Sequence, residues 1–220
     1  MLGRSELSRS PSPDGVSSGR LVGVVALQGD VSEHLEAFRK VLGEAGEAIP
    51  IRRRGEVAGC DALSLPGGES TTIGRLLAEK GIGPEIAEAA RRGVPVLGTC
   101  AGLVLLAKRV TDELERGSPG NGGRVTPLGL MDIAADRNAF GRQRESFEAN
   151  LDFPALGREP CPALFIRAPA IASTGPGVEV LARHQGRIVA ARQGNLLALA
   201  FHPELTGDPR PLRYFLAMGG

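Results

Sequence analysis

Cys100 is the residue whose surroundings most strongly suggest chemistry. It lies in the segment G-T-C-A-G (98–102), which follows a short apolar run and precedes a longer one. A strand, a tight turn and a helix in this order form a nucleophile elbow, here with cysteine where hydrolases of that architecture carry serine. Glycines leave room for the strained turn, and the start of a helix favours the thiolate. The segment predicts a covalent nucleophile, although taken alone it fits a buried structural cysteine equally well.

A histidine and a glutamate near the C-terminus could serve this cysteine. They lie in the segment F-H-P-E-L (201–205), where Pro203 favours an extended backbone at His202. Residues two apart on an extended chain face the same side, so Glu204 could fix the tautomer and orientation of the imidazole. The alternative is a half-buried histidine beside a surface glutamate, but the elbow favours a triad. Of the other two histidines, His34 fits an ordinary helix face and His184 an exposed turn.

The segment L-P-G-G-E-S-T-T (65–72) offers backbone donors for an oxyanion. A strand ends in paired glycines, and a helix follows that Ser70 or Thr71 could cap, with Glu69 close to its start. Paired glycines expose N–H groups, so Gly68 is one candidate donor and Ala101, directly after the nucleophile, is the second. The segment lacks the Lys-Ser/Thr ending of a phosphate loop. By itself it would fit a glycine-rich turn with a good cap.

Composition narrows the class of protein. A chain of 220 residues with 42% hydrophobic residues can bury one substantial core. A net charge of +1, no tryptophan and a single tyrosine give no basis for nucleic-acid binding. Three widely spaced cysteines argue for a reducing, cytoplasmic compartment. We expect no metal site, because no Cys/His cluster has ligand spacing, and no membrane association, because no apolar segment reaches spanning length.

The order of predicted elements indicates an α/β fold. Residues 1–20 are rich in serine, proline and glycine and predict a disordered extension, while 21–220 are expected to form a single domain that begins with a strand at Leu21. Strands and helices then alternate, which predicts a three-layer α/β/α fold with a mostly parallel central sheet and functional loops at the carboxyl ends of its strands. The expected strands are 21–27, 48–51, 62–65 and 94–97, and the expected helices are 30–42, 70 onward, 84–91 and the one after Cys100.

The second half of the chain has a different pattern. Short strands are expected at 163–166, 178–182, 187–192 and 196–201, partly antiparallel. A glycine-rich loop, Arg116–Arg124, interrupts the middle.

Several of these segments together resemble a known family. Cys100, His202 and Glu204, with the motifs around them, resemble the class I (triad) glutamine amidotransferases, whose fold is flavodoxin-like. The chain from about residue 21 to 218 is more narrowly similar to the glutaminase subunits of pyridoxal 5'-phosphate synthase. Val104 agrees with this branch, because relatives that feed other synthases usually carry glutamine there. The matching blocks are A-L-Q-G-D (26–30), L-P-G-G-E-S-T-T (65–72), G-T-C-A-G-L (98–103), R-N-A-F-G-R-Q (137–143), S-F-E (146–148), F-I-R-A-P (165–169) and F-H-P-E-L-T (201–206).

The resemblance implies hydrolysis of L-glutamine to glutamate and ammonia, without a cofactor. Cys100 would attack the side-chain amide, His202 would move the proton and Glu204 would orient His202, while Gly68 and Ala101 would donate N–H groups to the oxyanion. The ammonia would pass to a separate, barrel-shaped synthase subunit that builds pyridoxal 5'-phosphate, and activity would be weak until that partner docks.

The resemblance also assigns glutamine contacts. Arginines suit an α-carboxylate, and a carboxylate with hydroxyls at a helix end suits an α-amino group. The residues so implied are Gly68, Glu69, Ser70, Arg137, Ile166 and Arg167. The N-terminal extension and the length of the Arg116–Arg124 loop depart from the family and bear on partner docking.

Two functions from other classes remain as alternatives. One is a thiol hydrolase acting on another small substrate, such as an ester or lactone. The other is a non-enzymatic redox sensor built on Cys100, in which the pairing of His202 with Glu204 would have no purpose.

Overall fold

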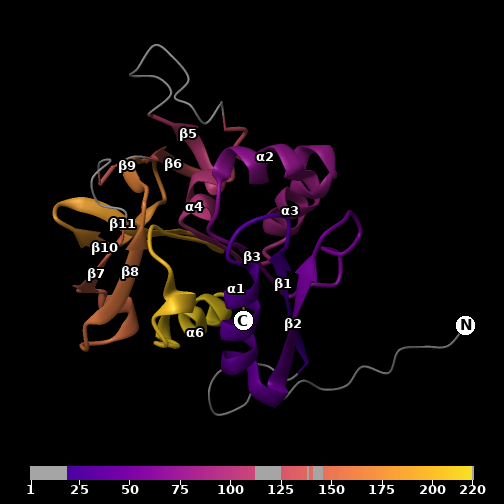
Figure 1. Ribbon diagram of the computed structural model, residues 1–220, viewed down its shortest axis with the longest axis horizontal. Helices are drawn as coiled ribbons and strands as arrows, with labels where there is room; N and C mark the ends of the chain where they lie inside the picture. The colour runs from indigo at the N-terminus through magenta and orange to yellow at the C-terminus, as the bar shows by residue number, and fades with distance from the viewer. Residues whose placement is uncertain (1–18, 112–124, 138, 141–145, 220) are drawn as a thin grey trace, which may run out of the picture.

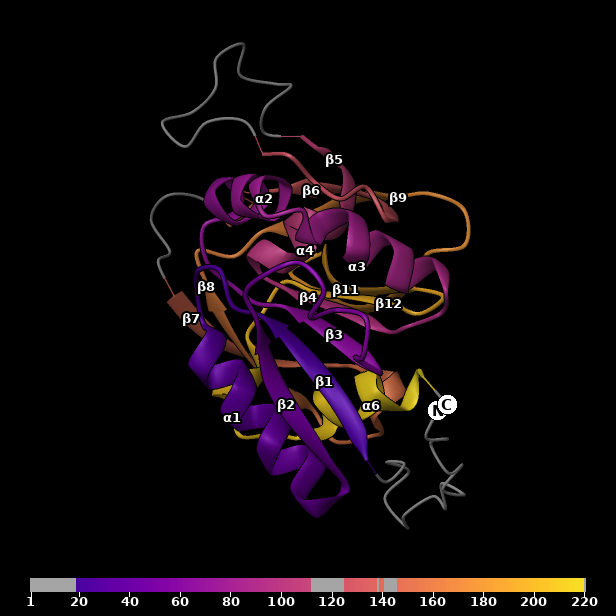
Figure 2. The ribbon, with the colours of Figure 1, turned by 90° about the vertical axis from the view of Figure 1, so that its right-hand side faces the viewer.

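The structure is a computed structural model that describes residues 19–111, 125–137, 139–140 and 146–219. The expected extension up to residue 18 and the Arg116–Arg124 loop lie outside the described residues. A ten-stranded sheet has the order β2-β1-β3-β4-β12-β11-β9-β6-β5, with β10 paired to β11 (Figure 1 and Figure 2).

The first five strands of this order are parallel. Pairing is parallel between β1 and β2, β1 and β3, β3 and β4, and β4 and β12. Burial is nearly complete in β1, β3, β4 and β12, as expected for strands covered on both faces, whereas the edge strand β2 is largely half-buried. Their bounds are β2 Gly46–Ile51, β1 Arg20–Val25, β3 Ala62–Leu65, β4 Val96–Thr99 and β12 Leu196–Leu199.

The rest of the sheet is mainly antiparallel. β11 pairs antiparallel with β12, β10 and β9, and β9 with β6, whereas β5 and β6 are parallel. A separate antiparallel hairpin joins β7 and β8. The partly antiparallel second half is therefore confirmed. The bounds are β5 Ala107–Val110, β6 Met131–Asp136, β7 Ser146–Leu151, β8 Cys161–Ile166, β9 Ala170–Thr174, β10 Glu179–His184 and β11 Arg187–Gln193.

Helices cover both faces of the sheet, which confirms the three-layer arrangement (Figure 2). α1 and α6 lie on one face. Phe38 of α1 packs edge-on against Phe215 of α6, with 6.0 Å between the ring centroids. α2, α3 and α4 lie on the other face. The bounds are α1 Val31–Leu42, α2 Ser70–Glu79, α3 Ile82–Arg91, α4 Ala101–Leu106 and α6 Arg210–Ala217, with 3-10 turns η1 Gly43–Ala45, η2 Pro154–Leu156 and η3 Pro203–Leu205.

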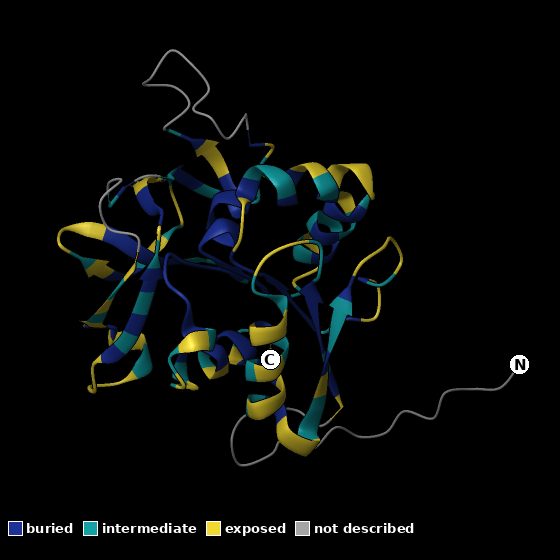
Figure 3. Ribbon diagram, in the orientation of Figure 1, coloured by how far each residue is buried: buried dark blue, intermediate teal, exposed yellow. Residues whose placement is uncertain are grey.

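The core follows the parallel strands and the inner faces of the helices (Figure 3). α4 is buried at every position, which explains its uninterrupted apolar sequence. The amphipathic α1 buries one stripe, His34, Phe38 and Leu42. In the described part of the chain, no helix combines the length and the apolar character needed to cross a membrane.

The predicted elements of the first half are confirmed with small shifts at their ends. β1 begins at Arg20, one residue before the expected start, because this arginine is buried and its guanidinium donates to the carbonyls of Leu216 and Gly219. β1 also ends at Val25, and the chain then turns so that Asp30 N–H reaches the Gly67 carbonyl. The strands β5, β6, β7 and β9 and the helix α6 were not predicted.

Candidate active site

The candidate site lies where four neighbouring parallel strands end. Loops leave the carboxyl ends of β1, β3, β4 and β12 at one edge of the sheet, and they carry Asp30, Gly68, Cys100 and His202. Leu199 pairs with Thr99, so the segments after these two residues leave the sheet side by side. The predicted placement of the functional loops at strand ends is therefore confirmed.

The turn at Cys100 has the strained geometry of an elbow. Cys100 has φ 49° and ψ −106°, a backbone conformation that residues other than glycine rarely adopt. Its N–H donates to Leu199 O at 2.8 Å, which fixes the turn against β12. A Cβ on Gly98 would lie 2.5 Å from the carbonyl carbon of Gly102, and one on Gly102 would collide with the carbonyl oxygen of Leu65. Close packing therefore requires both glycines of the motif.

Glu204 pairs with His202 as predicted, but not through an extended backbone. Residues 203–205 form the 3-10 turn η3, and Nδ1 of His202 lies 2.6 Å from Oε1 of Glu204. Pro203 begins this turn, since its fixed φ suits the first position of a helical turn. The expectation of an extended segment is wrong in this respect. The side chains are 2% and 0% exposed, so the pairing is shielded from water.

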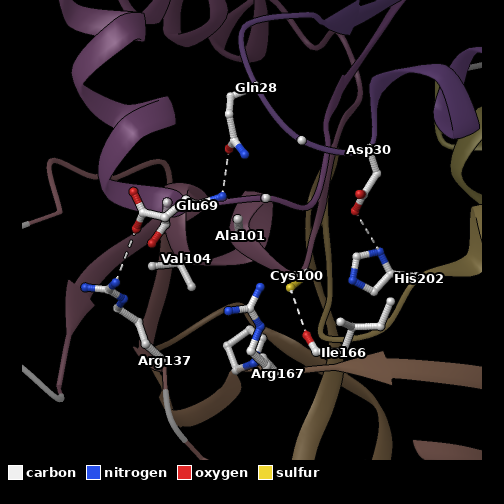
Figure 4. Close-up of a pocket in the computed structure, with 14 residues that line it drawn as sticks. Gln28, Asp30, Glu69, Cys100, Ala101, Val104, Arg137, Ile166, Arg167 and His202 are labelled. Atoms are coloured by element: carbon white, nitrogen blue, oxygen red, sulfur yellow. Dashed lines mark hydrogen bonds and ion pairs between the residues drawn. The ribbon is translucent and has the colours of Figure 1, made fainter. Parts of the chain in front are cut away.

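The second ring nitrogen of His202 points toward the Cys100 sulfur (Figure 4). Burial disfavours the imidazolium, but the proximity of Cys100 and the hydrogen bond and charge interaction with Glu204 outweigh it and raise the pKa of His202 to about 10. Burial alone would raise the pKa of Glu204, yet the adjacent His34 and His202 hold it well below its usual range. The pair therefore favours a carboxylate beside an imidazolium.

The paired glycines lie against the loop that follows β1. Gly68 has φ +146°, and a Cβ there would lie 2.6 Å from Oε1 of Gln28. That same oxygen accepts a hydrogen bond from the N–H of Glu69 at 2.7 Å, and the N–H of Asp30 donates to Gly67 O at 3.2 Å. The loop after β1 thus fixes the backbone of the predicted oxyanion segment.

A cavity of about 400 Å³ opens over these groups (Figure 4). Every predicted site residue except Glu204, which is buried behind His202, lies on its wall. The predicted residues that line it are Gly68, Glu69, Ser70, Cys100, Ala101, Arg137, Ile166, Arg167 and His202.

Charged side chains form one wall of this cavity. Glu69 caps α2 by accepting from the N–H groups of Thr71 and Thr72, at 3.1 and 2.7 Å, so the prediction that Ser70 or Thr71 caps the helix is wrong. The longer Glu69 side chain reaches both donors. Nη2 of Arg137 lies 3.5 Å from Oε1 of Glu69, and Figure 4 shows the two side chains pointing toward each other.

A second strained backbone lies close to Cys100. Arg167, directly after β8, has φ 42°. The carbonyl of the preceding Ile166 lies 3.8 Å from the Cys100 sulfur. Positive φ at a residue other than glycine is a feature of functional sites, and here it occurs at two residues that line one cavity.

Sequence reasoning missed several residues of the site. Gln28, Gly29, Asp30, Val104 and Pro169 also line the cavity. The motif A-L-Q-G-D was the available signal for the first three, since it lies directly after a strand.

His34 lies on a helix face with Phe38, as predicted, but its contact with Glu204 was not predicted, and the predicted exposure of His184 is wrong. His34 is completely buried, with Nε2 3.3 Å from Oε1 of Glu204. Helical spacing alone could not reveal this, because it depends on α1 crossing the end of β12. His184 is half-buried instead of exposed. Its ring stacks on those of Phe147 and Phe165, with centroid separations of 5.4 and 5.6 Å.

Asp30, His202 and Glu204 bring potential metal-ligand atoms within 4.8 Å of one another. Two ligands around a tetrahedral ion with bonds of about 2.0 Å lie roughly 3.3 Å apart. The 2.6 Å separation between Nδ1 of His202 and Oε1 of Glu204 is shorter than this and typical of a hydrogen bond. The present geometry is therefore that of a hydrogen-bonded pair.

Comparisons with known proteins agree with this geometry. Residues 24–219 match the model of the SNO glutamine amidotransferase family. A Methanosarcina acetivorans protein named pyridoxal 5'-phosphate synthase subunit PdxT is 56% identical over 198 residues, which cover 89% of this chain and 96% of that relative. A protein of the same name from Archaeoglobus fulgidus is 51% identical over 201 residues, covering 90% of this chain and 98% of that relative.

Solved structures give the same result. A crystal structure described as a glutamine amidotransferase has a TM-score of 0.80 and 46% identity, covering 90% of this chain and 98% of that one. The PurLQS structure from Thermotoga maritima has a TM-score of 0.64 and 19% identity, covering 91% of this chain and 97% of that one, and shares the fold. With its elbow, its buried histidine–glutamate pair and these likenesses, the chain belongs to the SNO glutamine amidotransferase family.

Proposed function

We propose that this chain hydrolyses L-glutamine to glutamate and ammonia and passes the ammonia to a separate synthase subunit for pyridoxal 5'-phosphate biosynthesis. The observation that carries the proposal is the placement of Cys100, on a strained elbow, beside a buried His202–Glu204 pair at the base of a cavity with charged walls. The relatives named pyridoxal 5'-phosphate synthase subunit support the destination of the ammonia.

In this proposal Cys100 is the nucleophile and His202 transfers the proton. The Cys100 thiolate attacks the side-chain amide carbon, a C–S bond forms and the carbonyl π electrons move to oxygen. The backbone N–H groups of Gly68 and Ala101 stabilise that oxyanion. The imidazolium of His202 then donates its Nε2 proton to the amide nitrogen as the C–N bond breaks, so ammonia leaves and a thioester remains.

Water completes the reaction. Nε2 of His202, now neutral, takes a proton from the attacking water, and the second tetrahedral intermediate expels the thiolate and releases glutamate. Glu204 holds the imidazole in one orientation through the Nδ1 hydrogen bond during both steps. The raised pKa of His202 supports its role as the acid in the first step.

The walls of the cavity suit the two charged ends of an amino acid. Glu69 can accept from an α-ammonium group, and Arg137 and Arg167 can donate to an α-carboxylate. Ile166 and Ser70 complete the binding surface next to the nucleophile. The 3.5 Å contact between Arg137 and Glu69 supports this assignment, since it pairs the two charges that a zwitterion would engage.

The proposal places the reaction in the cytoplasm, where an unpaired nucleophilic thiol stays reduced. Cys100 is free in the structure, as are Cys60 and Cys161. The partner that receives the ammonia is a separate synthase subunit, barrel-shaped as the family resemblance implies. The relatives' names, which describe a subunit of pyridoxal 5'-phosphate synthase, support a partner subunit.

Ammonia release from L-glutamine tests the proposal. The chain is assayed with and without the synthase subunit, beside a Cys100→Ala control. We expect release that rises when the subunit is present and disappears in the control. Release by Cys100→Ala, or no release even in the complex, would contradict the proposal.

A glutamine-like diazo ketone separates the alternatives. We expect it to label Cys100 and L-glutamine to protect against that labelling. A thiol hydrolase of esters or lactones would show no protection by L-glutamine, and a redox sensor would be labelled by oxidants without any turnover.

A further inference from the structure

A second histidine, His34, contacts the Glu204 carboxylate. His34 belongs to the first turn of α1, and its ring is completely buried. Its Nε2 lies 3.3 Å from Oε1 of Glu204, the same oxygen that accepts from Nδ1 of His202 at 2.6 Å. Two imidazoles from distant parts of the chain therefore meet on one carboxylate oxygen.

Two buried hydroxyls fix the His34 ring. Oγ of Ser64 in β3 lies 3.1 Å from Nδ1, and Oγ1 of Thr99 at the end of β4 lies 3.0 Å from Nε2. Both residues are completely buried. A buried polar network of this kind is costly unless each member finds a partner, so these four side chains act together.

The network selects one tautomer of His34. If Ser64 donates its hydroxyl proton to Nδ1, then Nε2 carries the hydrogen and points it at Thr99 and at the carboxylate. The opposite tautomer would direct the Nε2 lone pair at a carboxylate oxygen 3.3 Å away, which is repulsive. The Nε2–H form is therefore the neutral form that the surroundings favour.

The position and charge of the Glu204 carboxylate depend on hydrogen bonds from two donors, His34 and His202. Its side chain is completely buried, and its other oxygen, Oε2, makes no hydrogen bond to any residue that the structure describes. Without His34, a buried carboxylate would keep only the bond from His202. Removing a donor from a buried charge both weakens its ionisation and frees it to rotate.

We propose that His34 is a positioning residue for Glu204: its Nε2–H holds the carboxylate ionised and in the orientation that accepts from His202. The inference rests on the proposed function, because it assigns His34 a role in the reaction that Cys100 and His202 carry out. Ser64 acts indirectly, because its contact with Nδ1 keeps the Nε2 hydrogen of His34 directed at the carboxylate.

The test compares three variants in the complex with the synthase subunit. His34→Leu removes the donor, and His34→Gln keeps an N–H group near the position of Nε2. Leu42→Ala is a matched control on the same buried stripe of α1, two helical turns from His34. We expect His34→Leu to lower kcat roughly tenfold with KM within about twofold, His34→Gln to recover most of the loss, and Leu42→Ala to lower only thermal stability.

Two further readouts separate positioning from structural support. In a Glu204→Gln background, His34→Leu should change kcat by less than about twofold, because the group through which it acts has been altered. The acid limb of the pH profile of kcat/KM should move to higher pH in His34→Leu, since Glu204 then keeps its proton more readily. The other titratable groups that face this carboxylate, His202 and Asp30 beyond it, are unchanged in that comparison.

Each outcome has one meaning. Equal kcat in His34→Leu and Leu42→Ala, no rescue by His34→Gln, or independent effects of His34→Leu and Glu204→Gln would overturn the inference. If His34→Leu does not fold, Ser64→Ala replaces it, and an unchanged kcat and pH profile there would overturn it. An active Cys100→Ala would contradict the proposed function itself, whereas an inactive Cys100→Ala with a normal His34→Leu would contradict only the role of His34.

Discussion

Nδ1 of His202 lies 2.6 Å from Oε1 of Glu204, and their side chains are 2% and 0% exposed. The short turn of η3 brings the two side chains together over a single intervening proline. Because water is excluded, the carboxylate favours the charged imidazole far more than it would at the surface. This bond sets both the orientation and the protonation state of the ring that faces Cys100.

Replacing Glu204 with glutamine should remove the charge and keep the shape. We expect kcat for glutamine hydrolysis to fall by roughly 10²- to 10⁴-fold, with KM little changed, because Glu204 does not line the cavity. Steady-state ammonia release in the complex measures both constants. Glu179→Gln, at an exposed position of β10, is the control. A kcat within threefold of the unaltered protein would contradict the role of Glu204.

The proposed nucleophile, base and orienting carboxylate were within reach of the sequence, because each is encoded locally. The elbow is read from glycines and apolar runs around Cys100, and the pairing of His202 with Glu204 from two neighbouring positions. The inner parallel strands β3, β4 and β12 were also predictable, since they are short, largely apolar runs buried on both faces. The glutamine contacts required the family resemblance, because isolated arginines such as Arg137 carry no local signal.

Other features depend on tertiary contacts that no local pattern encodes. The burial of His34 requires α1 to lie across the ends of β3, β4 and β12, so helical spacing alone suggested an ordinary face. The strands β7 and β9 were missed because they have few buried positions: β7 is exposed or half-buried up to its last residue, and only the first two residues of β9 are buried. The turn at Pro203 was misjudged because proline also suits the first position of a helical turn.

The protonation of His202 should depend on Cys100. A pKa raised from 6.5 to about 10 means that the imidazolium persists through neutral pH. It also means that the associated stability is fully present below pH 6.5 and is lost as pH rises toward 10. In Cys100→Ala one of the interactions that raises the pKa is removed, so we expect His202 to titrate at lower pH. NMR titration of its Cε1–H resonance in both proteins measures the shift. Identical titration curves would show that Cys100 does not interact with the ring.

Arg137 should act on substrate binding more than on the chemical step. Its guanidinium lies on the cavity wall, 3.5 Å from Glu69, and away from the triad. We expect Arg137→Met to raise KM for glutamine about tenfold or more, because a charged hydrogen bond contributes about 1.5–3 kcal/mol, with kcat within threefold. Arg183→Met, at an exposed position of β10, serves as the control. A fall in kcat at unchanged KM would place Arg137 in the chemical step instead.

Gly67 should tolerate no side chain, because the imidazole occupies the space. A Cβ there would collide with Cε1 of His202 and lie 2.6 Å from Oδ2 of Asp30. We expect Gly67→Ala to displace the ring and reduce glutaminase activity at least tenfold, since small displacements of catalytic groups have large effects. Gly59→Ala is the matched control, because the nearest atom to its Cβ would be 4.0 Å away. Full activity in Gly67→Ala would contradict the close packing of this loop against His202.

Arg20 should contribute to stability and not to catalysis. Its buried guanidinium joins the start of β1 to the end of α6, by donating to the carbonyls of Leu216 and of Gly219, the latter at 3.3 Å. Removing a charged donor from buried carbonyls costs about 1–3 kcal/mol, so Arg20→Met should lower the free energy of unfolding by about 2 kcal/mol. Urea unfolding measures this, with Arg213→Met on the exposed face of α6 as the control. Because Arg20 lies at the opposite ends of the strands from Cys100, kcat should stay unchanged, and an equal stability of the two variants would contradict the anchoring role.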